Sequence, residues 1–258
     1  MIQPMILLFW NLNTWRNRAR GITNEHLWNW ALEHCSADIH VFTEAATPPP
    51  ERYSEEWWFV YRSDGFRRRK SWGTVIALRK STGLELKRLS LAGEESSYRL
   101  DTHFPGSLTA ADVIKGDKYI LRLVGMYLPY RKDKARNFVS RPSSDLVQMR
   151  DDFDALATAE VPLVIGGDLN EEYSTIPTIF ETLGRGNKRM VDPFVGHQLI
   201  TFQQDWGNRK RFCLDYLYLS QDLAENIVDK RGGIDDFPTA FTMSDHAPLS
   251  VTVELRHG

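Results

Sequence analysis

Cysteine is nearly absent from this sequence of 258 residues, which contains only Cys35 and Cys213. The two thiols lie far apart and lack the spacing of metal ligands, so the sequence argues against a zinc site. We expect both cysteines to be free thiols. Sparse, unpaired cysteine fits a reducing compartment, and we therefore expect a cytoplasmic protein.

Long apolar runs and an excess of one charge are lacking as well. The run from Met5 to Trp10 is too short for a signal peptide with its cleavage site, and no stretch approaches a membrane span. The 32 Lys and Arg residues nearly balance the 34 Asp and Glu residues, which leaves a net charge of −2. We expect no membrane partner, and any contact with nucleic acid has to come from local basic patches.

Apolar residues are plentiful, at 42% of the chain with 12% aromatic residues, which is ample for a substantial core. No repeat, linker or low-complexity segment appears, so we predict one domain over residues 1–258. Apolar periodicity predicts a mixture of strands and helices. The clearest strands are expected at 5–9, 38–43, 163–165, 214–219 and 249–255, and helices are expected after Thr23 or Asn24 and after Ser143 or Ser144.

The interpretation of the sequence depends most on residues 163–170, Leu-Val-Ile-Gly-Gly-Asp-Leu-Asn. The three apolar residues predict a buried strand, and the glycines are expected to let the chain turn tightly as it leaves the sheet. Side chains two apart on an extended chain point the same way, so Asp168 and Asn170 can share one target. An Asx turn after a strand explains the stretch about as well, and other parts of the chain have to decide.

Polar side chains follow several other predicted strands. Together the strand ends offer Asn11, Glu44, Tyr127, Asp168, Asn170, Asp215, Asp245 and His246. Carboxylates with a single histidine and no thiolate suit Mg²⁺ or Mn²⁺ rather than zinc. Such ions mostly serve phosphate chemistry, which needs a cation on the phosphate oxygens, a base that orients water and a donor facing the developing negative charge. The residue types for all three parts are present.

Six motifs, in their order and spacing, resemble the endonuclease/exonuclease/phosphatase superfamily with its DNase I-like fold. They are WNLN at 10–13, the strand-end Glu44, YLP at 127–129, GGDLN at 166–170, LDYLYLS at 214–220 and SDH at 244–246. The similarity spans nearly the whole chain. It implies an α/β fold, a four-layer α/β/β/α sandwich of two mostly antiparallel sheets with outer helices, and a site where loops meet at one edge.

The resemblance also implies roles on the metal side of the site. Glu44 is expected to bind a divalent cation, Mg²⁺ or Mn²⁺. Asn11 is expected to help position that metal and the phosphate, and Asp245 to join the metal ligands. Asp168 is expected to activate or orient the attacking water, with Asn170 holding water or phosphate beside it.

On the opposite side, the resemblance implies that His246 hydrogen-bonds the scissile phosphate while Asp215 holds its ring. A carboxylate on one ring nitrogen fixes the tautomer and favours the cationic form. Tyr127 stands where DNase-like members have His and abasic-site endonucleases of the exonuclease III type have Tyr, so the chain leans toward the latter. Those enzymes usually carry Arg at the position of Cys213, and many carry Asp at that of Asn13, which argues against a dedicated abasic-site role.

We therefore expect a divalent-metal-dependent phosphodiesterase that hydrolyses nucleic acid, DNA above all, as an endonuclease or exonuclease by in-line attack of water. Two basic stretches could meet a phosphate backbone, although solvated loops explain them too. Their candidate substrate-binding residues are Arg67, Arg68, Arg69, Lys70, Arg131 and Arg136. The alternatives are a phosphatase or phosphodiesterase acting on a phosphorylated small molecule or lipid headgroup, and a catalytically silent binding module.

Overall fold

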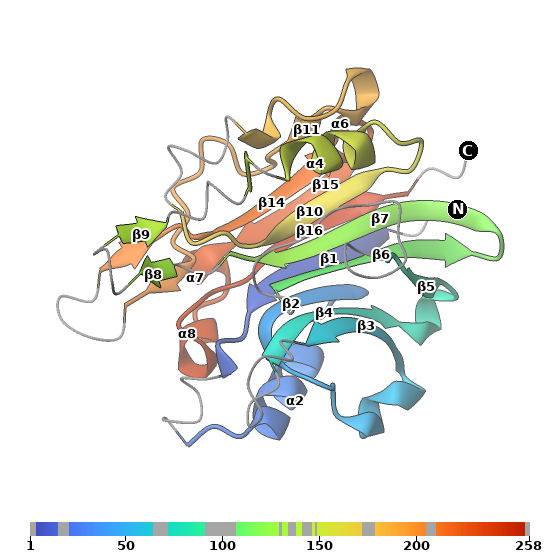
Figure 1. Ribbon diagram of the computed structural model, residues 1–258. Helices are drawn as coiled ribbons and strands as arrows, with labels where there is room; N and C mark the ends of the chain where they lie inside the picture. The colour runs from blue at the N-terminus through green and yellow to red at the C-terminus, as the bar shows by residue number, and fades with distance from the viewer. Residues whose placement is uncertain are drawn as a thin grey trace.

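Two six-stranded sheets lie face to face with helices outside them, in the computed structural model of the chain (Figure 1). This is the four-layer α/β/β/α arrangement that the resemblance implies. The structure describes residues 4–14, 21–63, 72–90, 107–128, 131–133, 138–140, 146–147, 149–171, 179–204 and 210–255. No helix in these ranges is long and apolar enough to cross a lipid bilayer.

The first sheet is antiparallel except for the pair β1 and β2, which run parallel at its centre. Its strands, in spatial order, are β15 (Ile227–Gly232), β16 (Leu249–Glu254), β1 (Pro4–Asn11), β2 (Ile39–Ala46), β4 (Trp72–Arg79) and β3 (Trp57–Ser63).

The second sheet has the same design, with β10 and β7 as its one parallel pair. Its strands, in spatial order, are β11 (Met190–Val191), β14 (Asp215–Ser220), β10 (Leu163–Asp168), β7 (Lys118–Tyr127), β6 (Leu108–Lys115) and β5 (Glu85–Arg88). The expectation of mostly antiparallel sheets is confirmed.

Shorter elements complete the described part of the chain. Two small hairpins pair β8 (Arg131–Asp133) with β9 (Phe138–Ser140) and β12 (Phe202–Gln203) with β13 (Arg211–Phe212). The helices are α2 (Asn24–His34), α4 (Arg150–Ala157), α6 (Gln221–Ala224), α7 (Gly233–Asp236) and α8 (Ala240–Met243), with 3₁₀ turns η1 (Glu51–Glu55), η2 (Lys80–Thr82) and η4 (Gly186–Lys188).

The core lies in three layers because each central strand is buried on both faces. Between the sheets, Phe9 and Val41 pack with Val164 and Leu217 of the opposite sheet. Outside the first sheet, α2 covers one strand face, and outside the second, α4 covers another. Strands buried on both faces show nearly continuous apolar runs, which explains why the sequence predicts them so clearly.

Helix α2 begins where the sequence predicts, because the Thr23 hydroxyl accepts a hydrogen bond from the His26 backbone N–H at 3.1 Å. Its buried face carries Leu27, Trp28, Ala31 and Leu32. Helix α4 is described from Arg150, and its expected start at Ser143 or Ser144 falls outside the described residues.

The two glycines of GGDLN do not turn the chain, which corrects the expectation from the sequence. Both lie within β10, where neighbouring atoms leave no room for a side chain. A Cβ on Gly166 would stand 2.6 Å from the Phe9 ring, and one on Gly167 would stand 2.0 Å from the Met126 carbonyl oxygen. Gly167 also has φ +139°. The glycines therefore allow the backbone to approach its neighbours closely, so that β10 can pack between β7 and the opposite sheet.

His40 in β2 is a core residue. Its ring is fully buried, with Phe42 and Trp57 at centroid distances of 5.1 Å. Burial and the nearby charge of Arg79 lower the pKa of His40 from 6.5 to about 3, against a weaker opposing effect of the Ala37 backbone. The folded protein therefore holds a neutral imidazole at every pH near neutrality.

This buried imidazole predicts a loss of stability in mild acid. The unfolded chain takes up a proton at His40 near pH 6.5, but the folded chain does so only near pH 3. The free energy of unfolding is therefore unaffected by His40 above pH 6.5. Below pH 6.5 it falls by up to about 1.4 kcal/mol per pH unit, because the unfolded chain binds a proton that the folded chain does not. Urea unfolding from pH 7 to pH 4 measures this slope, and His40→Phe is expected to flatten it. A slope unchanged in His40→Phe would contradict the assignment.

Candidate active site

The central parallel pairs of the two sheets bring the polar strand ends to one edge of the sandwich. In the first sheet, Asn11 at the end of β1 pairs in register with Thr43 of β2, one residue before Glu44. In the second, Asp168 at the end of β10 is flanked in register by Tyr127 and Asp215. These are the strand ends at which the sequence predicts a site.

Asn11 connects the two sheets at this edge. Its Nδ2 donates to Asp168 Oδ2 at 2.7 Å and to Glu44 Oε2 at 3.1 Å. The orientation of the amide is fixed, because Asn11 Oδ1 accepts the backbone N–H of Asn13 at 2.8 Å. The two carboxylates therefore converge on one nitrogen, with their oxygens gathered around it.

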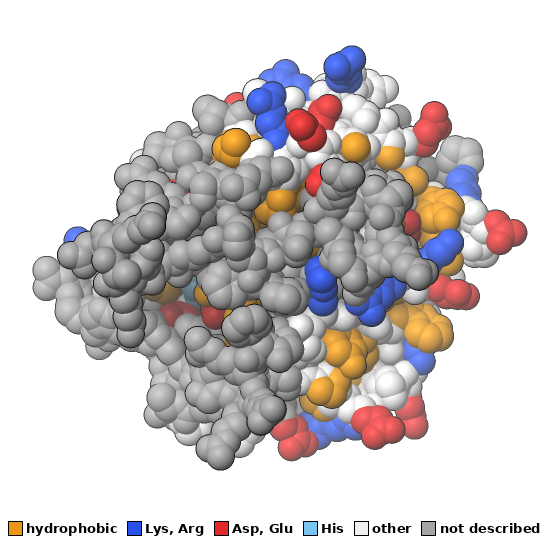
Figure 2. Space-filling view, in the orientation of Figure 1, with side chains coloured by type: hydrophobic (Ala, Val, Ile, Leu, Met, Phe, Trp, Pro, Cys, Tyr) orange, Lys and Arg blue, Asp and Glu red, His pale blue; other side chains and the backbone are white. Residues whose placement is uncertain are grey.

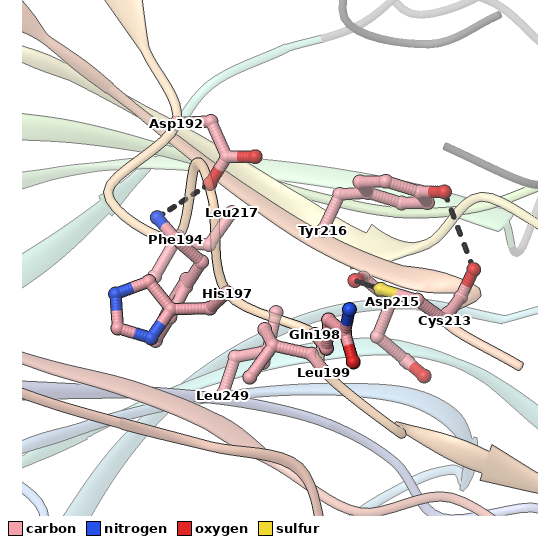
Figure 3. A pocket seen from close by; sticks show the side chains of 10 residues that line it. All are labelled: Asp192, Phe194, His197, Gln198, Leu199, Cys213, Asp215, Tyr216, Leu217 and Leu249. Atoms are coloured by element: carbon pink, nitrogen blue, oxygen red, sulfur yellow. Dashed lines mark hydrogen bonds between the residues drawn. The ribbon is translucent and has the colours of Figure 1, made fainter. Parts of the chain in front are cut away.

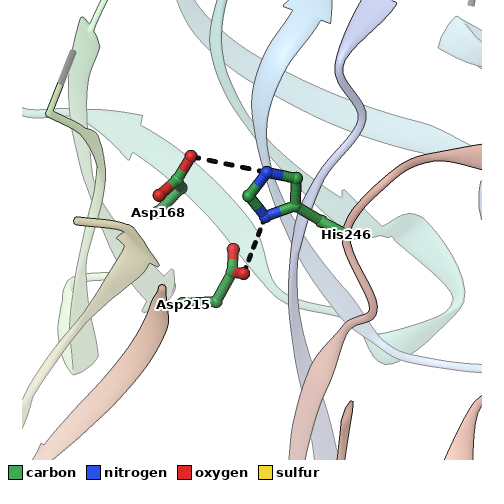
Figure 4. A group of neighbouring side chains, drawn as sticks. All are labelled: Asp168, Asp215 and His246. Atoms are coloured by element: carbon green, nitrogen blue, oxygen red, sulfur yellow. Dashed lines mark hydrogen bonds and ion pairs between the residues drawn. The ribbon is translucent and has the colours of Figure 1, made fainter. Parts of the chain in front are cut away.

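His246 and Asp215 form the predicted pair. Nδ1 of His246 lies 2.8 Å from Asp215 Oδ2, and both residues are buried (Figure 4). The other ring nitrogen, Nε2, lies 3.7 Å from Asp168 Oδ2 and 3.8 Å from Asp245 Oδ1. These separations are ion-pair distances, longer than a hydrogen bond, so Nε2 faces two carboxylates without bonding to either.

Asp168 and Asn170 do not share a target side by side on an extended strand, which corrects the geometry expected from the sequence. Asn170 has φ +51° and folds back, so that its backbone N–H donates to Asp168 Oδ1 at 2.8 Å. Its Nδ2 donates to Asp168 Oδ2 at 3.1 Å. The Asx turn and the site are thus the same structure, in which Asn170 holds the carboxylate in place.

Strained backbone also marks this edge. Within the described residues, positive φ outside glycine occurs at Asn13 (40°), Glu44 (46°) and Asn170 (51°). Asn tolerates this region, whereas for Glu such a conformation costs on the order of 1 kcal/mol or more. Glu44 also lies where the register between β2 and β4 shifts, between Phe42 and Ala45. Such irregularities re-aim side chains, and here the irregularity coincides with the hydrogen bond that Glu44 accepts from Asn11.

Tyr127 adds a second hydrogen bond to Glu44. Burial raises the pKa of Glu44, opposed by the hydrogen bonds from Asn11 and Tyr127 and by the charge of His246. Burial likewise raises the pKa of Tyr127 well above its usual value, with further upward contributions from Glu44 and Asp168. The phenol therefore stays protonated and acts as a donor to the Glu44 carboxylate.

The buried acids repel one another, and His246 partly offsets that repulsion. Burial raises the pKa of Asp168 well above its usual value, and the charges of Asp215 and Glu44 raise it further, against the lowering effect of His246. Burial alone would lower the pKa of His246, but Asp215 and Asp168 outweigh it and raise the pKa to about 10. His246 is therefore cationic at neutral pH.

The oxygen atoms at this edge are suitable ligands for a divalent cation. Glu44, Asp168 and Asp245 supply hard oxygen atoms, the kind of ligand that Mg²⁺ and Mn²⁺ prefer. Burial raises the pKa of Asp168 and the charge of Glu44 raises it further, and a bound cation would offset both effects. Asp168, Asp215 and His246 also place one potential ligand atom each within 4.8 Å of one another. In that trio, however, Asp215 and the His246 ring are already bonded to each other.

Asn13 is a site residue that the sequence does not identify. Its Nδ2 donates to Asp245 Oδ1 at 2.6 Å, and its backbone N–H orients Asn11. Asn13 thus joins the residue that holds two carboxylates to the loop that carries His246. The available signal is the second Asn of WNLN, which stands where many of the resembling enzymes carry Asp.

Replacing Asn13 by Ala is expected to lower turnover about ten- to a hundredfold while leaving the protein folded, the range typical for residues that orient metal ligands. Both the aim of Asp245 and its attachment to the Asn11 strand would be lost. Steady-state kinetics on a phosphodiester substrate, with circular dichroism, measure this effect. Asn187→Ala, at an exposed position in η4, is the matched control and should be indistinguishable from wild type. Equal turnover in both variants would remove Asn13 from the site.

The expected basic substrate-binding stretches cannot be placed at this edge. Arg67, Arg68, Arg69, Lys70 and Arg136 lie outside the described residues. Arg131 begins β8, but only the course of its backbone is described. The strands β3 and β4, on either side of residues 64–71, pair in antiparallel register.

Acidic and histidine atoms are visible together in a hollow of the molecular surface. Figure 2 shows them on the side where α7 and α8 lie in Figure 1.

Comparisons with known proteins agree on the fold. No protein-family model and no curated protein sequence matches the chain. Among solved structures, the catalytic domain of human Nocturnin has a TM-score of 0.66 at 13% identity, covering 99% of this chain and 97% of that one. An AP endonuclease from Archaeoglobus fulgidus has a TM-score of 0.63 at 17% identity, covering 97% and 100%. The chain has the DNase I-like fold. AP endonuclease LMAP from Leishmania major, at 18% identity, covers 99% and 89% with a TM-score of 0.63.

The DNase I-like fold is that of the endonuclease/exonuclease/phosphatase superfamily, to which these neighbours belong. The resemblance found in the six motifs is thus confirmed at the level of the fold. Similarity at such low identity does not assign an activity, because one fold supports many functions. The function has to be argued from the geometry of Asn11, Glu44, Asp168, Asp215 and His246.

Proposed function

We propose that this chain is a divalent-metal-dependent phosphodiesterase that hydrolyses phosphodiester bonds in DNA. One observation carries the proposal: the Asn11 amide holds the Glu44 and Asp168 carboxylates together, and the cationic ring of His246 faces the same Asp168 oxygen at 3.7 Å. The carboxylate pair and the cationic donor converge on one region, so a phosphate bound beside them would meet both a donor for its oxygens and an acceptor for the proton of an attacking water.

His246 supplies the donor. Because Asp215 occupies Nδ1, the proton on Nε2 is directed toward the space between Asp168 and Asp245. A phosphate oxygen in that space would receive a charge-assisted hydrogen bond, which strengthens as negative charge develops on the phosphorane-like transition state. Asp215 keeps the ring oriented and cationic throughout.

Asp168 supplies the base. Its raised pKa makes the carboxylate a better proton acceptor than an ordinary Asp. Asn11 and Asn170 hold its two oxygens in place by hydrogen bonds, so the group is already oriented before substrate arrives. It can therefore align a water molecule and take its proton as the new P–O bond forms and the leaving oxygen departs.

Glu44 and Asp245 are the residues that would hold the cation, and Asn11, which donates to Glu44 through Nδ2, would orient the first of them. A bound Mg²⁺ or Mn²⁺ would neutralise charge on the phosphate oxygens and on the leaving oxygen. Tyr127 hydrogen-bonds Glu44, so it sets the direction in which that carboxylate points.

The choice of DNA as substrate rests on the names of structural neighbours. They include two AP endonucleases and the 3′ phosphatase NExo from Neisseria, solved bound to product DNA hairpin. NExo has a TM-score of 0.60 at 14% identity, covering 98% of this chain and 100% of its own. The single domain and the cytoplasmic location expected from the sequence stay predictions.

A substrate panel tests the proposal. Purified protein with Mg²⁺ or Mn²⁺ is offered linear and supercoiled duplex DNA, single-stranded DNA, RNA, abasic duplex, and inositol phosphates as the small phosphorylated alternative. We expect hydrolysis of DNA whose KM rises steeply with salt, because contacts with a phosphate backbone release counterions. Faster hydrolysis of inositol phosphates, with little dependence on salt, would show that the substrate is a small phosphoester.

A further inference from the structure

The Asp215–His246 pair joins side chains that come from different sheets. Asp215 begins β14 of the second sheet, whereas His246 lies in the loop before β16 of the first. On the side of the first sheet, the Trp10 indole N–H donates to the His246 carbonyl oxygen at 2.8 Å, which ties the loop to β1. The separation of 2.8 Å between His246 Nδ1 and Asp215 Oδ2 therefore depends on what fixes the start of β14 relative to that loop.

Packing alone does not fix the start of β14. A cavity of about 190 Å³ lies beside it, and Cys213, Asp215 and Tyr216 are among the residues that line this cavity (Figure 3). A strand end that borders a cavity lacks close neighbours on that side. Hydrogen bonds have to hold it instead, and Figure 3 shows one of them, from the Tyr216 hydroxyl to the Cys213 carbonyl oxygen at 3.2 Å.

Thr201, which is fully buried, connects this strand end to the histidine loop. Its Oγ1 accepts the backbone N–H of Leu214 at 3.0 Å and that of Asp215 at 3.1 Å. Its carbonyl oxygen accepts the backbone N–H of Ala247, the residue after His246, at 2.7 Å. A single residue is thus bonded both to Asp215 and to the immediate neighbour of His246.

The segment around Thr201 is itself held on both sides. The Thr201 backbone N–H donates to the Phe212 carbonyl oxygen at 3.0 Å, and the Gln203 backbone N–H donates to the Asp245 carbonyl oxygen at 2.9 Å. Between them, the Phe202 ring lies against the His246 ring at a centroid distance of 4.9 Å. Residues 201–203 therefore form a support between the chain that enters β14 and the loop that carries His246.

We propose that Thr201 is a positioning residue, whose hydroxyl sets the distance and angle between the Asp215 carboxylate and the His246 ring. The bond from its carbonyl oxygen to Ala247 belongs to the backbone, so the hydroxyl is what the side chain contributes. Without it, two buried N–H groups lose their acceptor and the start of β14 shifts. The effect on catalysis rests on the proposed function, and a misplacement on the order of 1 Å can lower a rate about a hundredfold.

Thr201→Val is the test variant, because it keeps the shape of the side chain and replaces the hydroxyl by a methyl group. The His246 Nδ1 proton reports on the bond to Asp215, since a proton shared with a carboxylate resonates far downfield in proton NMR. Its loss in Asp215→Asn assigns the signal. In metal-free protein without substrate, we expect this signal to move upfield or vanish in Thr201→Val and to persist in Thr201→Ser, which keeps the hydroxyl.

Ser220→Ala is the matched control. Ser220 lies at the other end of β14, and its buried hydroxyl also accepts a backbone N–H, that of Leu163 at 3.1 Å. Its removal should lower stability but leave the Nδ1 signal and kcat unchanged. Where Thr201→Val does not fold, by circular dichroism, Thr201→Ala takes its place. An unchanged signal in the Thr201 variant, or an equal change in Ser220→Ala, would overturn the proposal whether or not the protein proves an active nuclease.

Kinetics on DNA test the catalytic consequence. Thr201→Val is expected to lower kcat about ten- to a hundredfold with KM near the wild-type value, the usual range for a residue that orients a functional group through a hydrogen bond. Thr201→Ser should restore kcat. In an Asp215→Asn background, Thr201→Val should cost little more, because both changes act on one interaction. Additive losses, or a Thr201→Ser variant as slow as Thr201→Val, would overturn the assignment.

Discussion

Asp168→Asn is expected to lower kcat for phosphodiester hydrolysis about a thousandfold. The change removes the proton acceptor while keeping the size of the side chain, and general base catalysis typically contributes about 10² to 10⁴ in rate. The carboxamide oxygen introduced at this position would still accept the backbone N–H of Asn170, the hydrogen bond that forms the turn, so the local backbone should persist. Single-turnover kinetics with saturating DNA and Mg²⁺ measure the chemical step without interference from product release.

The control for Asp168→Asn is another buried acid. Asp112 lies in β6, where it forms an ion pair with Arg122 at 2.6 Å, far from the strand ends of the site. Asp112→Asn is expected to lower the free energy of unfolding but to leave kcat of the folded protein near the wild-type value. If Asp168→Asn instead retained wild-type kcat, the water-activating role would belong to another residue.

Asp215→Asn is expected to lower kcat about a hundredfold or more, because it removes the charge that keeps the His246 ring cationic. In the wild-type protein, the charges of Asp215 and Asp168 outweigh the effect of burial and raise the pKa of His246 to about 10. Without Asp215, burial favours the neutral ring, which donates a weaker hydrogen bond to phosphate. A pH–rate profile of kcat checks this explanation, since the variant should recover part of its activity toward acid pH.

A purely structural role for Asp215 would give a different result. Loss of packing alone would lower the melting temperature and leave the shape of the pH–rate profile unchanged. His246→Gln, which also lacks the cationic donor, is expected to lose activity to a similar degree, and the double variant should lose little more, because both changes remove one interaction. Additive losses in the double variant would show that the two residues act independently.

The sequence predicts much of the site because hard ligands at strand ends are visible as short motifs. Asn11, Glu44, Asp168 and His246 each lie beside an apolar strand, and the fold needs only to bring those ends together. The strands themselves are predictable because they are buried on both faces. Strand β15 is not, since most of its residues are exposed and it forms an edge with little apolar pattern.

Contacts between distant segments lie beyond such prediction. Asn13 and Asp245 are 232 residues apart, and only the packing of β1 beside the loop before β16 makes them partners. The motif GGDLN suggests a turn at its glycines. Their actual role, to let neighbouring atoms approach the strand closely, depends on contacts that a sequence does not show. The same holds for Asp215: its pairing with His246 follows from the motifs, but the cavity that the residue borders depends on how β14 packs against the segment after β11.

Metal dependence is the most direct test of the central claim that these carboxylates form a hydrolytic site. DNA hydrolysis by the wild-type protein is followed in Mg²⁺, after removal of the cation with EDTA, and after excess Mg²⁺ is restored. We expect activity to vanish with EDTA and to return with Mg²⁺, while circular dichroism shows an intact fold throughout. Hydrolysis that continues at the same rate in EDTA, or a folded, Mg²⁺-supplied protein that cleaves no phosphoester at all, would contradict the account.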